Sequence, residues 1–297
     1  MRARVYDWHT VFGFSEKKFL RTFGLTKVDF LYLMTLVEKW LSERAVHPKG
    51  GHPFVLKPFD YLAITLLYIR QYHTMDSMAD EWGVSKGTIC KIYNKTITYL
   101  VTSGKLRLLS DKDLTDGDVV VVDATESPIN RPKKGQKEFY SGKKKRHMIK
   151  TQILFCKSKG LIVGIRLDKG HVHDFEIFKR SEAANLPEGV KEIGDSGYQG
   201  LGKLHQNSET PIKKPRSGKL SKEQKASNQQ LSKKRICIEH VNAWVKRFRI
   251  LKDRYRNRRY NFWKPMFLAC VAFNWNKPNM LNWRSLSSTA ISCTQRT

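Results

Sequence analysis

Residues 119–126 read VVVVDATE, and this stretch decides the fold class of the second half of the chain. A continuous β-branched run is typical of a strand buried on both faces, and the run ends at Asp123. Apolar runs predict further strands at residues 148–156 and 161–167, joined by the turn KSKG. The remaining pattern predicts a helix at 174–184, a short strand at 191–195, a long helix at 233–251 and an apolar helix at about 262–274. This order predicts an α/β domain with a mixed sheet covered by helices.

The first hundred residues have a helical pattern instead. Thr26 and Asp29 form a capping-box pair at the start of one predicted helix, and Pro58 lies in the first turn of another. The stretch between them, HPKGGHPF, is a predicted loop. This half of the chain is therefore predicted to be an all-α domain.

Residues 74–100 have the spacing of a helix-turn-helix. A short helix is predicted to end at Gly83, and Ser85 is placed to cap a longer one. Lys86 and Lys91 would then face outward, toward a DNA major groove. Two packed core helices of any helical domain have the same cadence, so the pattern alone leaves both interpretations open. The predicted organisation is a helical DNA-binding domain at 1–104, a linker at 105–117, the sheet domain at 118–281 and a tail at 282–297.

The charge of the chain indicates its partner. The 55 Lys and Arg residues against 27 Asp and Glu give a formal charge of +28, which points to a polyanion, with nucleic acid first. Peripheral membrane binding is the weaker alternative, because the longest apolar run, at 61–69, is too short to span a bilayer. The N-terminus has no secretory signal pattern, so we expect a cytoplasmic protein associated with the nucleoid. Five scattered cysteines without a CxxC pair indicate neither a disulfide framework nor a zinc finger.

Three carboxylates stand out by their positions. Asp123 follows the valine run, and Asp195 lies in IGDSGYQG, where Gly194 and Gly197 permit close approach of a backbone or ligand. Either aspartate taken alone is also explained as a turn or cap residue. Glu239 lies in the predicted long helix.

That helix has an apolar face and a separate polar stripe. The stripe consists of Arg235, Glu239, Asn242, Lys246 and Arg249, so one carboxylate lies among three cations. A solvated face with ion pairs one turn apart explains the same pattern. If the three carboxylates converge, they form an oxygen-rich site suited to Mg²⁺ or Mn²⁺. Two such ions, about 4 Å apart, activate a water or a 3′-hydroxyl in phosphodiester displacement.

At this point the sequence resembles a known family, the DDE transposases of bacterial insertion sequences, especially the insertion-sequence-five-like group. The resemblance covers roughly residues 26–278 and rests on VVVVDATE, IGDSGYQG and RICIEHVNAWVKRFRIL. Related transposases have a Tyr-Arg-Glu-Lys signature in the last region, and Arg235, Glu239 and Lys246 reproduce its spacing. The tyrosine position is Ser232 here, so that tyrosine's role is not carried over.

The resemblance implies a ribonuclease H-like catalytic domain with Asp123, Asp195 and Glu239 as catalytic metal ligands. It also implies Mg²⁺ or Mn²⁺, with two ions expected, and a homo-oligomer that acts on terminal inverted repeats and target DNA. Two alternatives remain: a transposase-derived DNA-binding protein that does not cut, and a metal-dependent nuclease without strand transfer. Retention of three mutually repelling acids argues against the first.

Basic stretches supply candidate DNA contacts. Residues 131–150 interleave cations with Phe139 and Tyr140, which suits phosphate contacts and base stacking; the candidates there are Lys143, Lys144, Lys145 and Arg146. Solvated loops are the alternative. Residues 246–259 are denser in cations, and residues 213–225 are predicted to be a mobile loop that orders on DNA.

The motif HVHD at 171–174 suggests a metal cluster, but no further ligand set accompanies it, so a role near the active site or a helix cap is favoured. Glu126 is the substitute carboxylate if one of the three acids is misassigned.

Overall fold

The computed structural model describes residues 5–45, 56–215 and 217–277. The chain divides into two compact units. Among the described residues, the helical unit comprises 5–45, 56–107, 247–252 and 261–277, and the sheet unit comprises 108–215, 217–246 and 253–260. The predicted loop at 47–54 and the predicted tail at 282–297 lie outside the described residues. No helix among the described residues combines the length and apolarity needed to cross a membrane.

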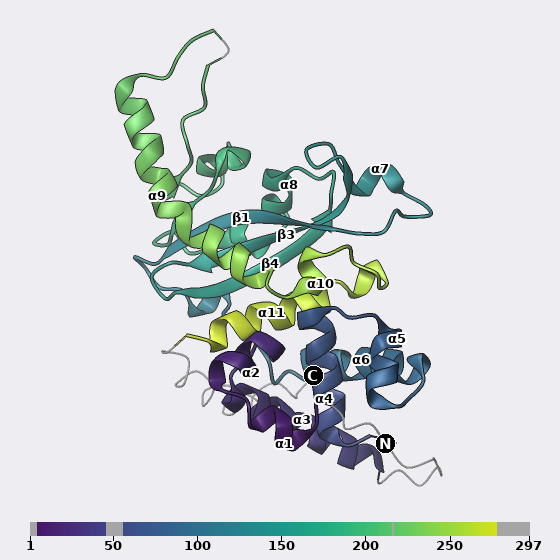
Figure 1. The fold of residues 1–297 in the computed structure, drawn as a ribbon. Helices are drawn as coiled ribbons and strands as arrows, with labels where there is room; N and C mark the ends of the chain where they lie inside the picture. The colour runs from purple at the N-terminus through teal and green to yellow at the C-terminus, as the bar shows by residue number, and fades with distance from the viewer. Residues whose placement is uncertain (1–4, 46–55, 216, 278–297) are drawn as a thin grey trace, which may run out of the picture. The chain divides into compact units, whose positions relative to one another are not determined.

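The helical unit contains two groups of helices that are distant in sequence (Figure 1). The first group is α1 (Trp8–Phe12), α2 (Glu16–Phe23), α3 (Lys27–Ala45), α4 (Pro58–Gln71), α5 (Met75–Trp82) and α6 (Lys86–Thr102). The second group is α10 (Arg249–Lys252) and α11 (Trp263–Trp275), which pack on α4 and α6. The sequence-based division placed these last two helices with the sheet. They lie in the helical unit because their apolar side chains complete its core.

The contact between Phe248 and Gly24 shows how closely residues 247–252 pack on the N-terminal helices. The buried Phe248 ring lies against Gly24, where an added Cβ would come within 2.5 Å of the ring. Gly24 also has a φ of 81°, in the left-handed region that favours glycine. The guanidinium of Arg70 lies 5.2 Å from the centre of the same ring. A larger residue at position 24 would therefore clash with the segment that completes the core.

The helix-turn-helix has the predicted caps. The Ser85 hydroxyl accepts from the Thr88 amide at 3.1 Å at the start of α6. Gly83 ends α5 with a φ of 63°, and the Val84 amide donates to the Ala79 carbonyl at 3.0 Å. Ala79 and Ile89 are buried between the helices. The all-α first half and this motif are thus confirmed.

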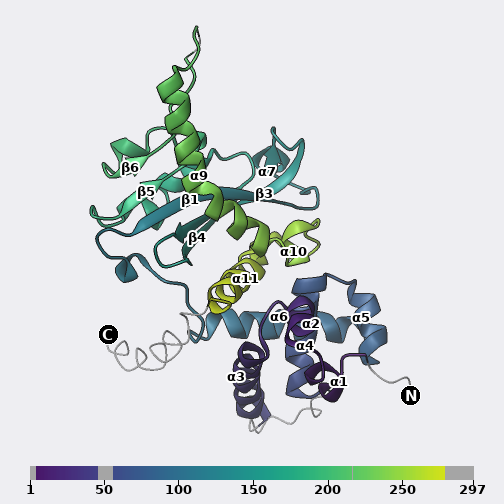
Figure 2. The same ribbon diagram turned by 60° about the vertical axis from the view of Figure 1, so that its left-hand side comes forward.

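The sheet unit is a mixed sheet with helices on it (Figures 1 and 2). Its strands are β1 (Val119–Pro128), β2 (Tyr140–Ser141), β3 (Arg146–Cys156), β4 (Leu161–Lys169), β5 (Lys191–Ile193) and β6 (Ser208–Glu209). β1 lies between antiparallel β3 and parallel β5, β4 pairs with β3, and β6 extends the sheet beyond β5. The remaining helices are α7 (Gln136–Phe139), α8 (Asp174–Lys179) and α9 (Lys222–Val245). The predicted fold class is confirmed.

The predicted bounds of three elements were wrong. β1 continues six residues past the valine run because antiparallel pairing with β3 extends to Pro128, so Asp123 lies in mid-strand. α8 ends at Lys179, where the chain turns and continues as a 3₁₀ turn at Glu182–Asn185. α9 begins at Lys222 after the N-cap Ser221, whose hydroxyl accepts from the Gln224 amide at 3.1 Å, and it ends at Val245. The part of the chain predicted as mobile at 213–225 therefore includes the first turn of this helix.

Candidate active site

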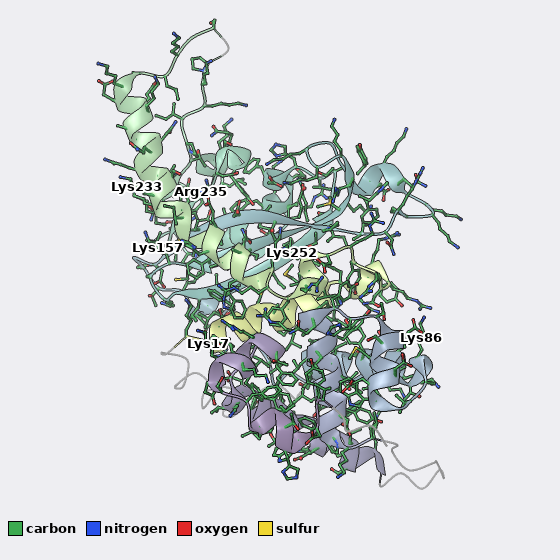
Figure 3. All side chains as sticks on the ribbon, in the orientation of Figure 1. Lys17, Lys86, Lys157, Lys233, Arg235 and Lys252 are labelled. Carbon is green, nitrogen blue, oxygen red and sulfur yellow. The ribbon has the colours of Figure 1, made fainter. Side chains whose placement is uncertain are left out.

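The centre of the site is Asp123, which α9 approaches. Asn242 Nδ2 donates to one carboxylate oxygen of Asp123 at 2.8 Å. Arg235, two helical turns earlier, has a guanidinium nitrogen 3.7 Å from the other oxygen. Figure 3 labels Arg235 on α9. Ile238, Val241 and Val245 are buried on the same helix and keep it packed against the sheet. The apolar face of α9 thus positions its polar stripe over β1.

The charge around Asp123 is only partly balanced. Burial raises the pKa of the Asp123 carboxyl to about 6, and the guanidinium of Arg235 opposes that shift. The carboxylates of Asp195 and Asp174 raise the pKa further. A cation placed between these carboxylates would favour their ionised forms. Carboxylate oxygens are suitable ligands for a divalent metal ion.

Asp195 is placed by the turn that follows β5. It caps the 3₁₀ turn Ser196–Tyr198, and one of its oxygens accepts from the Gly197 amide at 2.7 Å. A Cβ added at Gly197 would lie 2.9 Å from that oxygen and 3.2 Å from a carboxylate oxygen of Asp174. The glycine is therefore required by the close packing of two aspartates around it.

Asp174 of the HVHD motif, for which a role near the active site or a helix cap was expected, lies within electrostatic reach of Asp123. Lys150 Nζ lies 2.9 Å from one oxygen of Asp174 and also donates to the Val172 carbonyl at 2.7 Å. The same ammonium lies 3.9 Å from Glu126, whose oxygens accept from the buried Ser141 hydroxyl at 3.1 Å. Asp174 is the first residue of α8, and the helix cap is His173, so the alternative of a cap by Asp174 was wrong. Its proximity to the site depends on pairing between β1 and β3, which sequence does not give.

The histidines of the HVHD motif make backbone contacts. His173 caps α8 by accepting from the Phe175 amide at 3.4 Å. The His171 ring makes a hydrogen bond with the Glu138 carbonyl. Among the described residues, no three or more His, Cys, Asp or Glu side chains are grouped so that they would hold a metal ion.

Glu239 lies on α9 between Arg235 and Asn242, and its side chain is exposed. Glu239 lies about one helical turn from Arg235 and about one turn from Asn242, the two residues of α9 that contact Asp123. The structure thus brings Asp123, Asp195 and Asp174 within electrostatic reach of one another and leaves Glu239 at the solvent-facing part of the stripe.

A pocket of about 600 Å³ opens beside Asp123 within the sheet unit. Its lining includes Lys143, Lys144 and Lys246, three of the predicted DNA contacts. Lys246 Nζ donates to the Glu126 carbonyl at 3.0 Å, and burial, with the charge of Lys144, lowers the pKa of its ammonium. The pocket therefore joins the acidic centre to a basic wall.

The other predicted DNA contacts lie elsewhere. Lys145 and Arg146 are exposed at the turn that leads into β3. Arg249 does not lie on α9: the helix ends at Val245, and Arg249 begins α10 in the helical unit. Its predicted place on the polar stripe was wrong because the apolar periodicity continues from Val245 to Phe248 across a helix break. Lys86 and Lys91 are exposed on α6, and Lys86 lies 2.8 Å from Asp76 of α5 (Figure 3).

Two family models match the chain. Residues 55–106 match the helix-turn-helix of DDE superfamily endonuclease, and residues 122–274 match the DDE superfamily endonuclease itself. The first match contains α5 and α6, and the second contains Asp123, Asp195 and Glu239.

Two curated relatives cover most of the chain. One, from Microchaete diplosiphon, is 39% identical over 252 residues, which are 84% of this chain and 90% of the relative; its name describes it as a transposase for insertion sequence element IS702. Another, from Streptomyces albus G, is 25% identical over 242 residues, which are 80% of this chain and 88% of the relative; its name describes a transposase for insertion sequence element IS112. The chain therefore belongs to the DDE superfamily of endonucleases, among the insertion-sequence transposases that these relatives represent.

Proposed function

We propose that the chain is the transposase of an insertion sequence, and that it cleaves the ends of that element and joins them to target DNA. The observation that carries the proposal is the approach of α9 to Asp123. Asn242 and Arg235 contact a carboxylate that two further aspartates surround, beside a pocket with a basic wall. This combination suits a reaction at a phosphodiester, because the aspartates can hold divalent cations and the lysines of the pocket can contact phosphates.

Asp123, Asp195 and Glu239 are the proposed catalytic residues and metal ligands. When bound there, Mg²⁺ or Mn²⁺, in a two-ion site, would activate the attacking oxygen and stabilise the leaving oxygen. Asn242 holds one oxygen of Asp123 and so fixes the direction of the other. Arg235 has access to both Asp123 and an incoming phosphate from its place on α9. Lys143, Lys144, Lys145, Arg146 and Lys246 are proposed phosphate contacts on the sheet unit.

Recognition of the terminal repeat is assigned to α6. Lys86 and Lys91 are exposed on this helix, which is the second helix of the matched helix-turn-helix. The second helix of such a motif enters the major groove. We further propose Arg249 as a phosphate contact of the helical unit, a homo-oligomer on DNA, and membership of the insertion-sequence-five-like group.

The test is cleavage and strand transfer of labelled DNA that carries the element's own ends, with Mg²⁺ or Mn²⁺. The parent protein is compared with Asp123→Asn, Asp195→Asn and Glu239→Gln, and DNA binding is measured for each. The proposal expects joining by the parent and loss of joining, with binding retained, in all three variants. Unchanged activity in one variant removes that residue from the site. Cleavage without joining identifies a nuclease, and binding without cleavage identifies a DNA-binding protein.

A further inference from the structure

A partly buried ion pair beside the site joins β3 to the start of α8. Lys150 Nζ donates to one carboxylate oxygen of Asp174 at 2.9 Å and to the Val172 carbonyl at 2.7 Å. Only 12% of the Lys150 side chain and 29% of the Asp174 side chain are exposed. Solvent and salt screen such a pair less than a pair at the surface. Lys150 is therefore firmly attached to the loop that leads into α8.

The other side of the same ammonium faces β1. It lies 3.9 Å from a carboxylate oxygen of Glu126, the residue that pairs with Lys150 across the two strands. The hydroxyl of the buried Ser141 lies 3.1 Å from both carboxylate oxygens of Glu126 and so holds this carboxylate in place. A lysine side chain is ordinarily mobile, but this one lies between two fixed acids. Lys150 thus fixes the position of Asp174 relative to the sheet.

The second oxygen of Asp174 faces the turn that carries Asp195. It would lie 3.2 Å from a Cβ added at Gly197, and the Gly197 amide donates to the Asp195 carboxylate at 2.7 Å. Asp174 therefore packs against the residue that orients Asp195. Asp174 and Asp195 both raise the pKa of the Asp123 carboxyl, so the three acids lie close enough to repel one another. Without the charge of Lys150, this repulsion would drive Asp174 away from the turn.

A separate contact holds the far end of the same turn. The fully buried Gln152 of β3 accepts from the Tyr198 hydroxyl at 3.4 Å through its amide oxygen. Tyr198 ends the 3₁₀ turn that Asp195 caps, and its side chain is buried. The turn is therefore attached to β3 without the help of Lys150. Loss of the ion pair should loosen the turn around Gly197 and leave the rest of the sheet unit folded.

We propose that Lys150 is a positioning residue of the reaction, because its ion pair with Asp174 fixes the turn that carries Asp195. The inference rests on the proposed function, in which Asp195 is a catalytic residue. It also separates Lys150 from the lysines of the pocket that are assigned to DNA phosphates, since the ammonium of Lys150 is already bound by carboxylates of the protein itself.

Hydrogen exchange of the Gly197 amide measures how firmly the turn is held. Exchange is followed by mass spectrometry of a peptide spanning residues 194–200, in the protein without DNA. We expect exchange in Lys150→Met to be roughly tenfold faster than in the parent, because the loss of a hydrogen bond between charged groups makes local opening easier. Lys179→Met is the matched control: it breaks an exposed ion pair with Glu176 on α8 and removes the same charge, and it should exchange like the parent.

A second variant covers the case in which Lys150→Met does not fold. Lys150→Met combined with Asp174→Asn leaves no unpaired charge in the folded protein, yet it also lacks the ion pair. Its Gly197 amide should therefore exchange faster than that of the parent by a similar factor. Parent-like exchange of this amide in the variants that fold would show that the turn does not depend on the ion pair, and the inference would be overturned.

Single-turnover cleavage of the element's own ends with Mg²⁺, over a range of DNA concentrations, separates positioning from DNA binding. Lys150→Met should cleave roughly tenfold more slowly at saturating DNA, with a parent-like half-saturating DNA concentration. A raised half-saturating concentration with a parent-like rate would mean that Lys150 contacts DNA, which also overturns the inference. Failure of the parent to cleave would reject the proposed function instead, and the exchange measurement, made without DNA, would still report on the ion pair.

Discussion

At the scale of single residues, the site depends on how Asp123 is held. Its two carboxylate oxygens face different partners, the Asn242 amide at 2.8 Å and the Arg235 guanidinium at 3.7 Å. Sequence patterns identified Asp123 and placed Arg235 and Asn242 on one stripe. They left two roles open for Asp174, near the site or as a helix cap, because its place beside Gly197 follows from the packing of α8 against a distant turn. The proposed catalytic aspartate was thus more predictable than the residues that surround it.

Asn242→Ala tests whether the amide orients Asp123. Residues that orient a metal ligand typically contribute 10- to 100-fold, so we expect cleavage to fall by roughly that factor while DNA binding is kept. The half-saturating Mn²⁺ concentration should also rise. Cleavage rates measured across a Mn²⁺ series check both expectations, with Asn228→Ala as the control on the same helix. Parent-like rates and Mn²⁺ dependence would show that Asn242 has no positioning role.

A second residue, Glu192, links stability to pH. It is 1% exposed, neither of its carboxyl oxygens has a hydrogen-bond partner among the described residues, and burial raises its pKa to about 8. The folded protein therefore keeps a proton that the unfolded chain loses above its ordinary pKa of 4.5. The stabilising effect is complete below pH 4.5 and is lost progressively as the pH rises toward 8.

Urea unfolding of the parent and of Glu192→Gln at pH 5 and pH 8 checks this account. Since one pKa unit corresponds to about 1.4 kcal/mol, the loss for the parent amounts to a few kcal/mol across this interval. Glu192→Gln should lose much less because its side chain does not ionise. Equal pH dependence in the two proteins would mean that Glu192 ionises normally in the folded state.

At the scale of elements, those with long apolar runs were located more accurately from the sequence than those with polar ends. The strands β1, β3 and β4 were located because continuous β-branched and apolar runs leave few alternatives. The start of α9 was missed because its Lys- and Ser-rich first turns bury little: Leu231 is the first buried residue of the helix. Figures 1 and 2 show this part of α9 extending past the sheet. Its end was misplaced because Phe248 and Leu251 continue the periodicity but lie in the other unit.

The exposed face of α6 is proposed to recognise the terminal repeat. Lys86→Ala together with Lys91→Ala should reduce the preference for the terminal repeat over random DNA, because this helix is the proposed reader of base edges. Lys143→Ala with Lys144→Ala is the matched control, and it should weaken binding to both DNAs alike. Competition binding against random duplex gives the preference. An unchanged preference in the α6 variant would place recognition elsewhere.

At the scale of the whole molecule, the two units are not consecutive in sequence. The helical unit takes residues 247–252 and 261–277 from the far end of the described chain. Ten of the thirteen residues of α11 are buried, including Leu268, Cys270 and Phe273, and α11 packs on α6. Sequence reading favoured consecutive domains because each apolar helix was assigned to its neighbours in the chain. The apolar sequence of α11 predicts that the helix is buried, but it does not indicate which helices it packs against.

This arrangement predicts how fragments behave. Residues 1–107 expressed alone should not unfold cooperatively, because the surfaces that α10 and α11 cover would be exposed. Fusing residues 247–277 to that fragment through a flexible linker should restore a cooperative transition. Thermal unfolding followed by circular dichroism compares the two proteins. A cooperative transition in residues 1–107 alone would show that the late helices are dispensable for this core.

The most direct test of the central claim asks whether Asp123, Asp195 and Glu239 hold one metal site. Fe²⁺ bound in place of Mg²⁺ generates hydroxyl radicals with ascorbate and peroxide, and these cut the protein backbone near the ion. In the complex with DNA, we predict cuts near residues 123, 195 and 239 that are suppressed together by excess Mg²⁺ and by Asp123→Asn. Cuts that avoid α9 around Glu239, or that persist unchanged in Asp123→Asn, would contradict the account.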